Sequence, residues 1–241
     1  TSREIYNYFS ERRERIDNDN RTILVRVIRP KSEESRDNII FSTNNQTSIP
    51  KSSLRVTDTI HLQIERYFKN RGLYYDRRKN YYRNQKKKAI DIISVSFLAQ
   101  CLISLVLRKP DFARARPSTL LTDEETYKYL YEDNQDLEAY YKAARIGRSV
   151  QSSLKTSTDM INTEVNDILF YVIYAVVANE LKKKELSFID LKNFDLNKVT
   201  EGSISEISNR IYSKYIELGG NSRIAKSKTF IDDVCLLFDL S

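Results

Sequence analysis

Residues 161–181 read INTEVNDILFYVIYAVVANEL, a stretch in which apolar side chains surround almost the whole helical circumference. A helix that is apolar on every side is buried at the centre of a domain. The other apolar run, IISVSFLAQCLISLVL at residues 92–107, has 16 residues and includes serine and glutamine, which is short for a membrane span of about 20 residues. We therefore expect two core helices and no membrane partner.

Further helices are predicted on both sides of this centre from apolar positions that recur every three or four residues. They cover residues 1–16, 58–71, 203–218 and 227–240, and a tyrosine-rich stretch up to residue 141 that begins after Thr122 and Glu125, at capping-box spacing. Gly72 is expected to end the second of these helices. Most of the chain is therefore predicted to be helical.

Strand-like patterns are confined to the first half of the chain. Residues 21–30 are rich in β-branched side chains, residues 38–45 indicate a helix or short strand before a polar turn, and residues 74–82 could form a hairpin. Residues 111–125 are predicted to be a connector. We expect an α+β, predominantly α-helical fold, with a small N-terminal α/β element in residues 1–117 and a bundle-like helical region in residues 118–241.

Positive charge is concentrated in one part of the chain. Residues 66–116 hold fourteen lysines and arginines against three acids, a net of +11, whereas the whole chain carries +7. Such a local excess points to an anionic partner. The two cysteines, Cys101 and Cys235, lie in apolar runs and form no C-x-x-C pair, which is typical of a reducing compartment, so we expect a cytoplasmic location.

Sequence motifs for several kinds of chemistry are absent. The five glycines form neither a dinucleotide-binding G-x-G-x-x-G nor a P-loop, and a single histidine, His61, rules out multi-histidine zinc sites. His61 is expected to be a partly buried helix residue. No cofactor is evident, and we expect bound Mg²⁺ only if a nuclease site exists. Asp111, Glu180 and Asp190 belong to fragments that resemble the metal-binding pattern of a nuclease. In a chain that is 30% charged, chance explains these fragments better than a nuclease site does.

Three segments carry a family resemblance. FSTNNQTSIPKSSLR (41–55) has T-N-x-Q followed eight residues later by leucine, GLYYDRRKNYY (72–82) has an aromatic-Tyr-acid-Arg-Arg run, and LRKPDFARARPSTLL (107–121) has Ala-Arg before proline. Together they resemble the AIPR family of bacterial abortive-infection phage-resistance proteins over about residues 1–145. In that family an Asn-Gly-x-Gln-Thr element usually comes before the first helix. The chain is therefore expected to be a C-terminal portion that starts inside this element, with a weaker analogy to DGQHR and ParB-like modules.

The resemblance implies phage defence, and the residues suggest nucleic acid or nucleotide as the ligand. Short polar side chains in a turn can contact a nucleotide edge, arginine and lysine bind phosphate, and tyrosine stacks on bases. The predicted contact residues are Asn44, Gln46, Thr47, Tyr75, Arg77, Arg78, Lys79, Tyr82, Arg83, Arg114 and Arg116. The alternatives are a Mg²⁺-dependent nuclease, or an interaction module whose helical half binds a partner subunit or a second copy of the chain.

Overall fold

The computed structural model describes residues 58–78, 80–156 and 160–240, together with the isolated positions 10, 29, 32, 35 and 39. The chain divides into two compact units, Thr1–Thr43 and Asn44–Ser241, and every element described below belongs to the second unit. The helix, strand and turn predicted within residues 1–57 lie outside the continuous described ranges. The predicted domain boundary at residue 117 stays a prediction.

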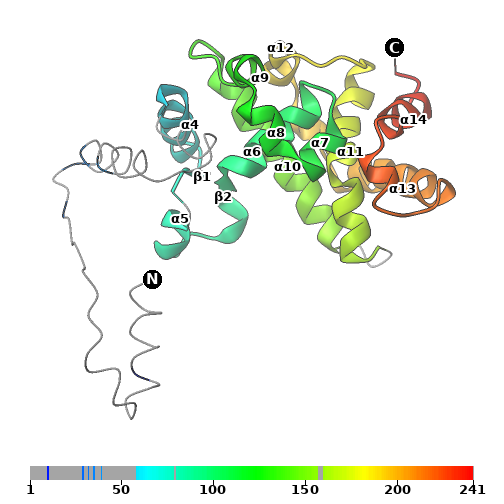
Figure 1. Cartoon of the computed structure of the whole chain (residues 1–241), viewed down its shortest axis with the longest axis horizontal. Coiled ribbons are helices and arrows are strands. Elements are labelled where there is room, and N and C mark those ends of the chain that lie inside the picture. Colours follow the sequence, from blue (N-terminus) through cyan, green and yellow to red (C-terminus); the bar gives the residue numbers. More distant parts are fainter. Residues whose placement is uncertain are drawn as a thin grey trace. The chain divides into compact units, whose positions relative to one another are not determined.

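The described elements are mostly helical and are connected by short loops (Figure 1). In chain order they are α4 (Thr59–Lys69), β1 (Tyr74–Asp76), α5 (Tyr81–Asn84), the 3-10 turn η3 (Ala89–Asp91), β2 (Ile92–Ser94), α6 (Val95–Leu105), α7 (Pro110–Ala115), α8 (Pro117–Thr122), α9 (Glu124–Leu130), α10 (Leu137–Thr156), α11 (Asn162–Leu181), α12 (Phe188–Asn193), η4 (Leu196–Lys198), α13 (Glu201–Glu217), η5 (Ile224–Lys226) and α14 (Phe230–Leu237). The predicted fold class, α+β and predominantly α-helical, is confirmed.

Helix α11 is the centre of the helical region, as its sequence predicts. Every residue from Ile168 to Ala178 is buried, and the helix packs against α6, α7, α10, α13 and α14. Helix α10 approaches α6 closely at Gly147, where a Cβ atom would meet the sulfur of Cys101. Helices from both halves of the chain therefore share one core. No helix in the described ranges is long and apolar enough to cross a membrane.

The two strands form a parallel pair, so the predicted hairpin at residues 74–82 is wrong. Tyr74 pairs with Ile92 and Asp76 with Ser94, while Tyr81–Asn84 is helical. Two parallel strands need a crossover of about a dozen residues or more, and residues 77–91 supply it through α5 and η3. The pairing also shortens the predicted helix at residues 92–107, because its first three residues belong to β2 and Ser94 caps α6.

The predicted connector at residues 111–125 is wrong as well, because it contains two short helices. Pro110 and Pro117 occupy the first turns of α7 and α8, where the fixed φ of proline favours helix and no amide donor is lost. The next helix, α9, begins one residue later than its capping-box pattern predicts. Its cap is Asp123, whose side chain accepts a hydrogen bond from the amide of Thr126, and not Thr122.

His61 is a buried residue of α4, in agreement with its expected structural role. Its two ring nitrogens lie 2.8 Å from the hydroxyl of Tyr75 and 3.2 Å from that of Tyr127, and Tyr127 in turn donates to Asp58. Burial, with a smaller contribution from the charge of Arg77, lowers the pKa of His61 from 6.5 to about 3. The imidazole is therefore neutral in the folded protein at neutral pH.

This lowered pKa predicts an acid-sensitive fold. In the unfolded chain His61 binds a proton below about pH 6.5, whereas in the folded protein it stays neutral down to about pH 3. The free energy of unfolding should therefore decrease as the pH is lowered through this window, by about 2 kcal/mol between pH 7 and pH 5. Urea unfolding at several pH values checks this. A His61→Gln variant should lose this part of the pH dependence, and an unchanged slope in that variant would contradict the assignment.

Candidate nucleic-acid interface

The basic crossover between β1 and β2 is attached to helix α4 through one carboxylate, Glu65. Its oxygens accept hydrogen bonds from Nε of Arg77 at 2.7 Å and from the hydroxyl of Tyr82 at 2.7 Å, and Nη2 of Arg78 lies 3.8 Å away. Burial, followed by the bond to Glu65, raises the pKa of Tyr82 well above its usual value, so Tyr82 stays a neutral donor. Glu65 thus fixes the inner side of the crossover.

Three of the predicted contact residues therefore lie inside the protein. Tyr75 has no exposed surface, and Arg77 and Tyr82 are 6% and 5% exposed. Successive side chains of a strand point to opposite sides, and Tyr75 is the buried member of the pair, whereas Tyr74 is partly exposed. Tyr75, Arg77 and Tyr82 use their polar groups on protein partners, so in this structure a nucleic acid cannot reach them.

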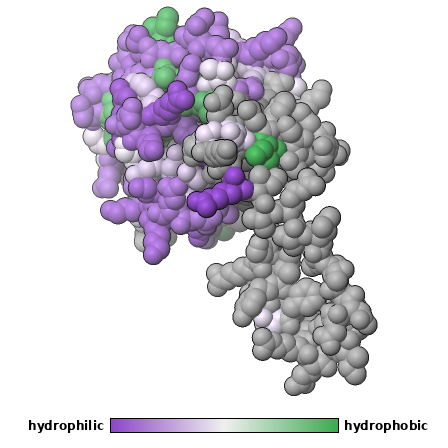
Figure 2. Space-filling model, turned by 90° about the vertical axis from the view of Figure 1, so that its left-hand side faces the viewer, coloured by the Kyte–Doolittle hydropathy of each residue, from purple (hydrophilic) through white to green (hydrophobic). Residues whose placement is uncertain are grey.

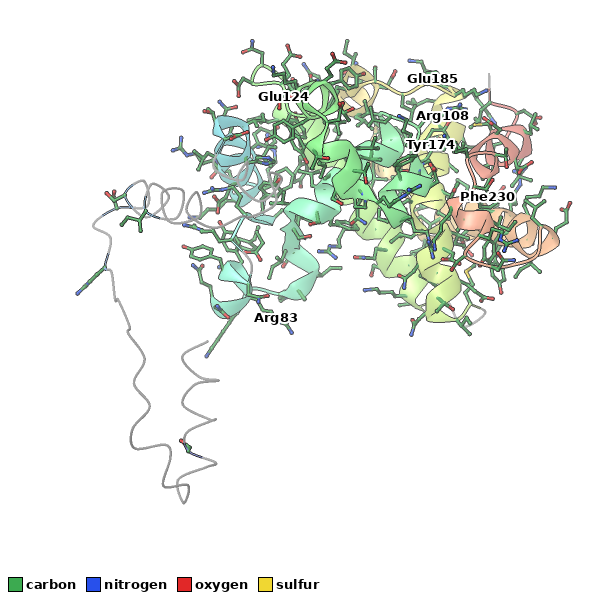
Figure 3. The ribbon with its side chains drawn as sticks, in the orientation of Figure 1. Arg83, Arg108, Glu124, Tyr174, Glu185 and Phe230 are labelled. Carbon is green, nitrogen blue, oxygen red and sulfur yellow. The ribbon has the colours of Figure 1, made fainter. Side chains whose placement is uncertain are left out.

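The outer side of the crossover carries the accessible charge. Arg83, Lys86, Lys87 and Lys88 are all exposed, and we call these four residues the crossover surface. None of them takes part in the ion pairs found within the described ranges. Arg83 lies at the end of α5, away from the helical core (Figure 3).

The shape of this surface is set by local backbone geometry. Asn80 and Lys86 lie on either side of α5 with φ angles of 65° and 60°, in the left-handed region. The carboxylate of Asp76 accepts a hydrogen bond from the amide of Asn80 at 2.8 Å, which fixes the entry to α5. The ammonium of Lys87 lies 4.7 Å from the centre of the Tyr74 ring. The coloured part of the face in Figure 2, on the α4 and α5 side of the molecule, is largely hydrophilic.

Two further predicted arginines, Arg114 of α7 and Arg116 between α7 and α8, have different surroundings. Arg114 is bonded to the buried carboxylate of Asp167 and to the hydroxyl of Ser222, so it has a structural partner. Arg116 is exposed and, with Lys226, lines a cavity of about 220 Å³ beside Asp111. Burial raises the pKa of Asp111 above its usual value. Of these two arginines, only Arg116 is available to an external anion.

Other predicted residues cannot be placed in this site. Asn44, Gln46, Thr47 and Lys79 lie outside the described residues. Within the described ranges, Arg78 is the one remaining member of the set, and its guanidinium lies 4.1 Å from the centre of the Tyr81 ring and close to Glu65. The role of these residues in binding nucleic acid stays a prediction.

The acids of the nuclease alternative do not form a ligand cluster among the described residues. Glu180 pairs with Lys198 at 3.3 Å. Asp190 accepts a hydrogen bond from the hydroxyl of Ser187, the N-cap of α12, and pairs with Lys183 at 2.7 Å. Residues 58–78, 80–156 and 160–240 contain no group of three or more histidine, cysteine or acidic side chains that could hold a metal ion.

A second concave site was not predicted from the sequence. A cavity of about 330 Å³ lies between α10, η3 and the start of α13. Its α10 wall is formed by Arg145, Arg148, Ser149, Ser152, Ser153 and Thr156. The hydroxyl residues follow the two arginines at helical spacing, and the sequence contains this pattern. We call this cavity the α10 groove.

Comparison with known proteins identifies the family. The model of the family described as "AIPR protein" matches residues 1–222, which is a longer stretch than the three motifs indicate. No curated protein and no solved structure matches the chain. The family match covers both the basic crossover and most of the helical region. The chain therefore belongs to the AIPR family, the abortive-infection phage-resistance proteins.

Proposed function

We propose that this protein acts in phage defence by binding nucleic acid through the crossover surface, in the cytoplasm. The observation that carries the proposal is the exposure of Arg83, Lys86, Lys87 and Lys88 on a segment with no acid between Arg77 and Ile90. Four exposed cations that have no ion-pair partner among the described residues attract phosphate and release counterions when they bind it. The two cysteines are free and buried, which suits a reducing compartment.

The same geometry favours contacts with the phosphate backbone over reading of base sequence. Lysine binds phosphate as a point charge without a fixed direction, and no helix of eight or more residues presents these side chains to a groove. Tyr74 and Tyr81 are partly exposed, and tyrosine stacks on unpaired bases. We therefore expect single-stranded nucleic acid to bind at least as well as duplex, with little sequence preference.

A charge-matched pair of variants tests the proposal. The first variant combines Arg83→Gln, Lys87→Gln and Lys88→Gln, and leaves Lys86 in place so that three positive charges are lost. The control combines Lys128→Gln, Lys192→Gln and Lys214→Gln, three lysines that already pair with acids at 3.7, 2.7 and 2.7 Å. Both variants lose three positive charges, so only the position of the lost charge differs.

Binding of labelled single strands and duplexes should be measured by fluorescence anisotropy over a range of salt concentrations. For single strands, the slope of log affinity against log salt should fall by about 2 in the crossover variant, since each lost phosphate contact removes about 0.7. The affinity near 0.1 M salt should fall at least tenfold, and the control should keep the wild-type slope. A folded wild-type protein that does not bind at low salt, or equal losses in both variants, would overturn the proposal.

A further inference from the structure

The α10 groove has a positively charged, hydroxyl-rich wall. Arg145 is exposed and takes part in none of the ion pairs found within the described ranges. Arg148 is held in place, since its guanidinium donates to the side-chain oxygen of Gln151 at 2.5 Å and to the carbonyl of Ile92. Its Nε is buried and has no acceptor among the described residues. The guanidinium is therefore fixed in position at the wall of the groove.

The other surfaces of the α10 groove differ in chemistry. Leu73, Ile90, Val199 and Ile204 provide apolar contact, and two carboxylates, Asp91 and Glu201, complete the lining. A simple anion would use the arginines and hydroxyls only and would be repelled by the carboxylates. A ligand that also carries hydrogen-bond donors and a flat apolar part would use every surface.

The size and the charge balance of the groove further restrict the kinds of ligand that it can bind. The lining contains two arginines and two carboxylates and so has no net charge, which does not suit a highly charged polyanion. A volume of about 330 Å³ lies at the lower end of the range for small-molecule sites, about 300–1,000 Å³. One phosphate, one sugar and one base together have this combination of anionic, donor and apolar groups.

We propose that the α10 groove binds a single nucleotide unit. Arg145, Arg148 and the α10 hydroxyls bind its phosphate, Asp91 and Glu201 accept hydrogen bonds from its sugar or base, and the apolar residues contact the base. The unit comes from a free nucleoside monophosphate or from the phosphorylated end of a strand, since Lys88 of the crossover surface directly precedes η3. Binding of a free nucleotide needs no residue of the crossover surface, so this inference does not depend on the function proposed above.

Titration calorimetry on the full chain tests the inference with the four common nucleoside monophosphates, inorganic phosphate, and a short single strand with and without a 5′-phosphate. At least one nucleotide should bind in a saturable manner and at least tenfold more tightly than phosphate. Arg145→Gln should weaken this binding at least tenfold, and Ser152→Asp, which adds a negative charge to the same wall, should abolish it. Lys155→Gln is the matched control, because Lys155 is exposed on the same helix and does not line the groove.

The outcomes separate the two possible sources and the two proposals. Tighter binding of the strand with a 5′-phosphate than of the same strand without it assigns the groove to a strand end, and equal binding of the two strands assigns it to a free nucleotide. The crossover variant, Arg83→Gln with Lys87→Gln and Lys88→Gln, should keep nucleotide binding while it loses the salt-dependent binding of strands. Absence of saturable binding at millimolar nucleotide, equal affinity for phosphate, or an equal loss in the Lys155→Gln variant would overturn the inference, provided that thermal unfolding shows each variant to be folded.

Discussion

Replacing Asp167 by alanine is expected to lower the free energy of unfolding by about 3–5 kcal/mol, the usual cost of breaking a buried ion pair from one side. Asp167 is 3% exposed on α11, the central helix. Its carboxylate receives bonds from the guanidinium of Arg114 on α7, from the hydroxyl of Tyr215 on α13 at 2.8 Å, and from Ser222 at 3.0 Å. Alanine would leave all three donors without their acceptor, and Arg114 would keep a charge in a poorly solvated position.

A double-mutant cycle separates the ion pair from the packing around it. Arg114→Met alone should cost less than Asp167→Ala, because the carboxylate that it leaves behind keeps the hydroxyl donors of Tyr215 and Ser222. The combination of Arg114→Met with Asp167→Leu should recover part of the loss, since a buried ion pair can often be replaced by apolar residues at little net cost. Unfolding in guanidinium chloride measures all three variants. A loss below about 1 kcal/mol in Asp167→Ala would show that solvent reaches the carboxylate.

The sequence predicts the helical core well because the required information is local. The near-complete apolar circumference of residues 165–178 identifies α11, and the spacing of Ile60, Ile64 and Phe68 identifies α4. Even Asp167 stands out in the sequence as an acid within an apolar run, although its partner Arg114 is more than fifty residues away. Local periodicity thus locates a buried carboxylate but does not identify the group that neutralises it.

The interface is harder to predict because its geometry depends on residues far apart in the chain. A count of charges treats Arg77 and Arg83 alike, yet Arg77 is bonded to Glu65 twelve residues earlier, and Arg83 has no such partner among the described residues. The hairpin prediction fails for a related reason. Tyr74 could pair with a nearby segment or with Ile92, and only tertiary packing around the buried Ile93 selects the parallel partner.

Replacing Glu65 by alanine is the second change with a large expected effect, about 3–5 kcal/mol in the free energy of unfolding. The side chain of Arg77 is only 2% exposed, so without Glu65 its Nε would lose, inside the protein, the carboxylate that now accepts its hydrogen bond at 2.7 Å. The hydroxyl of Tyr82 would lose its acceptor at the same time. Chemical unfolding and the melting temperature measure the loss, and Glu138→Ala is the control, since Glu138 is a less buried acid on α10 that accepts from Tyr67.

Glu65 also connects the stability of the fold to the proposed function, because it holds the inner side of the segment whose outer side carries the crossover surface. Glu65→Gln keeps an acceptor for Tyr82 but removes the charge that balances Arg77, so it should destabilise the protein less than alanine does. Its effect on nucleic-acid binding then discriminates between two physical explanations. If affinity depends only on the number of positive charges, loss of an acid should strengthen binding slightly. If affinity depends on the position of Arg83, Lys87 and Lys88, the loosened crossover should bind more weakly at a temperature where the variant is folded, and this weaker binding is the expected result.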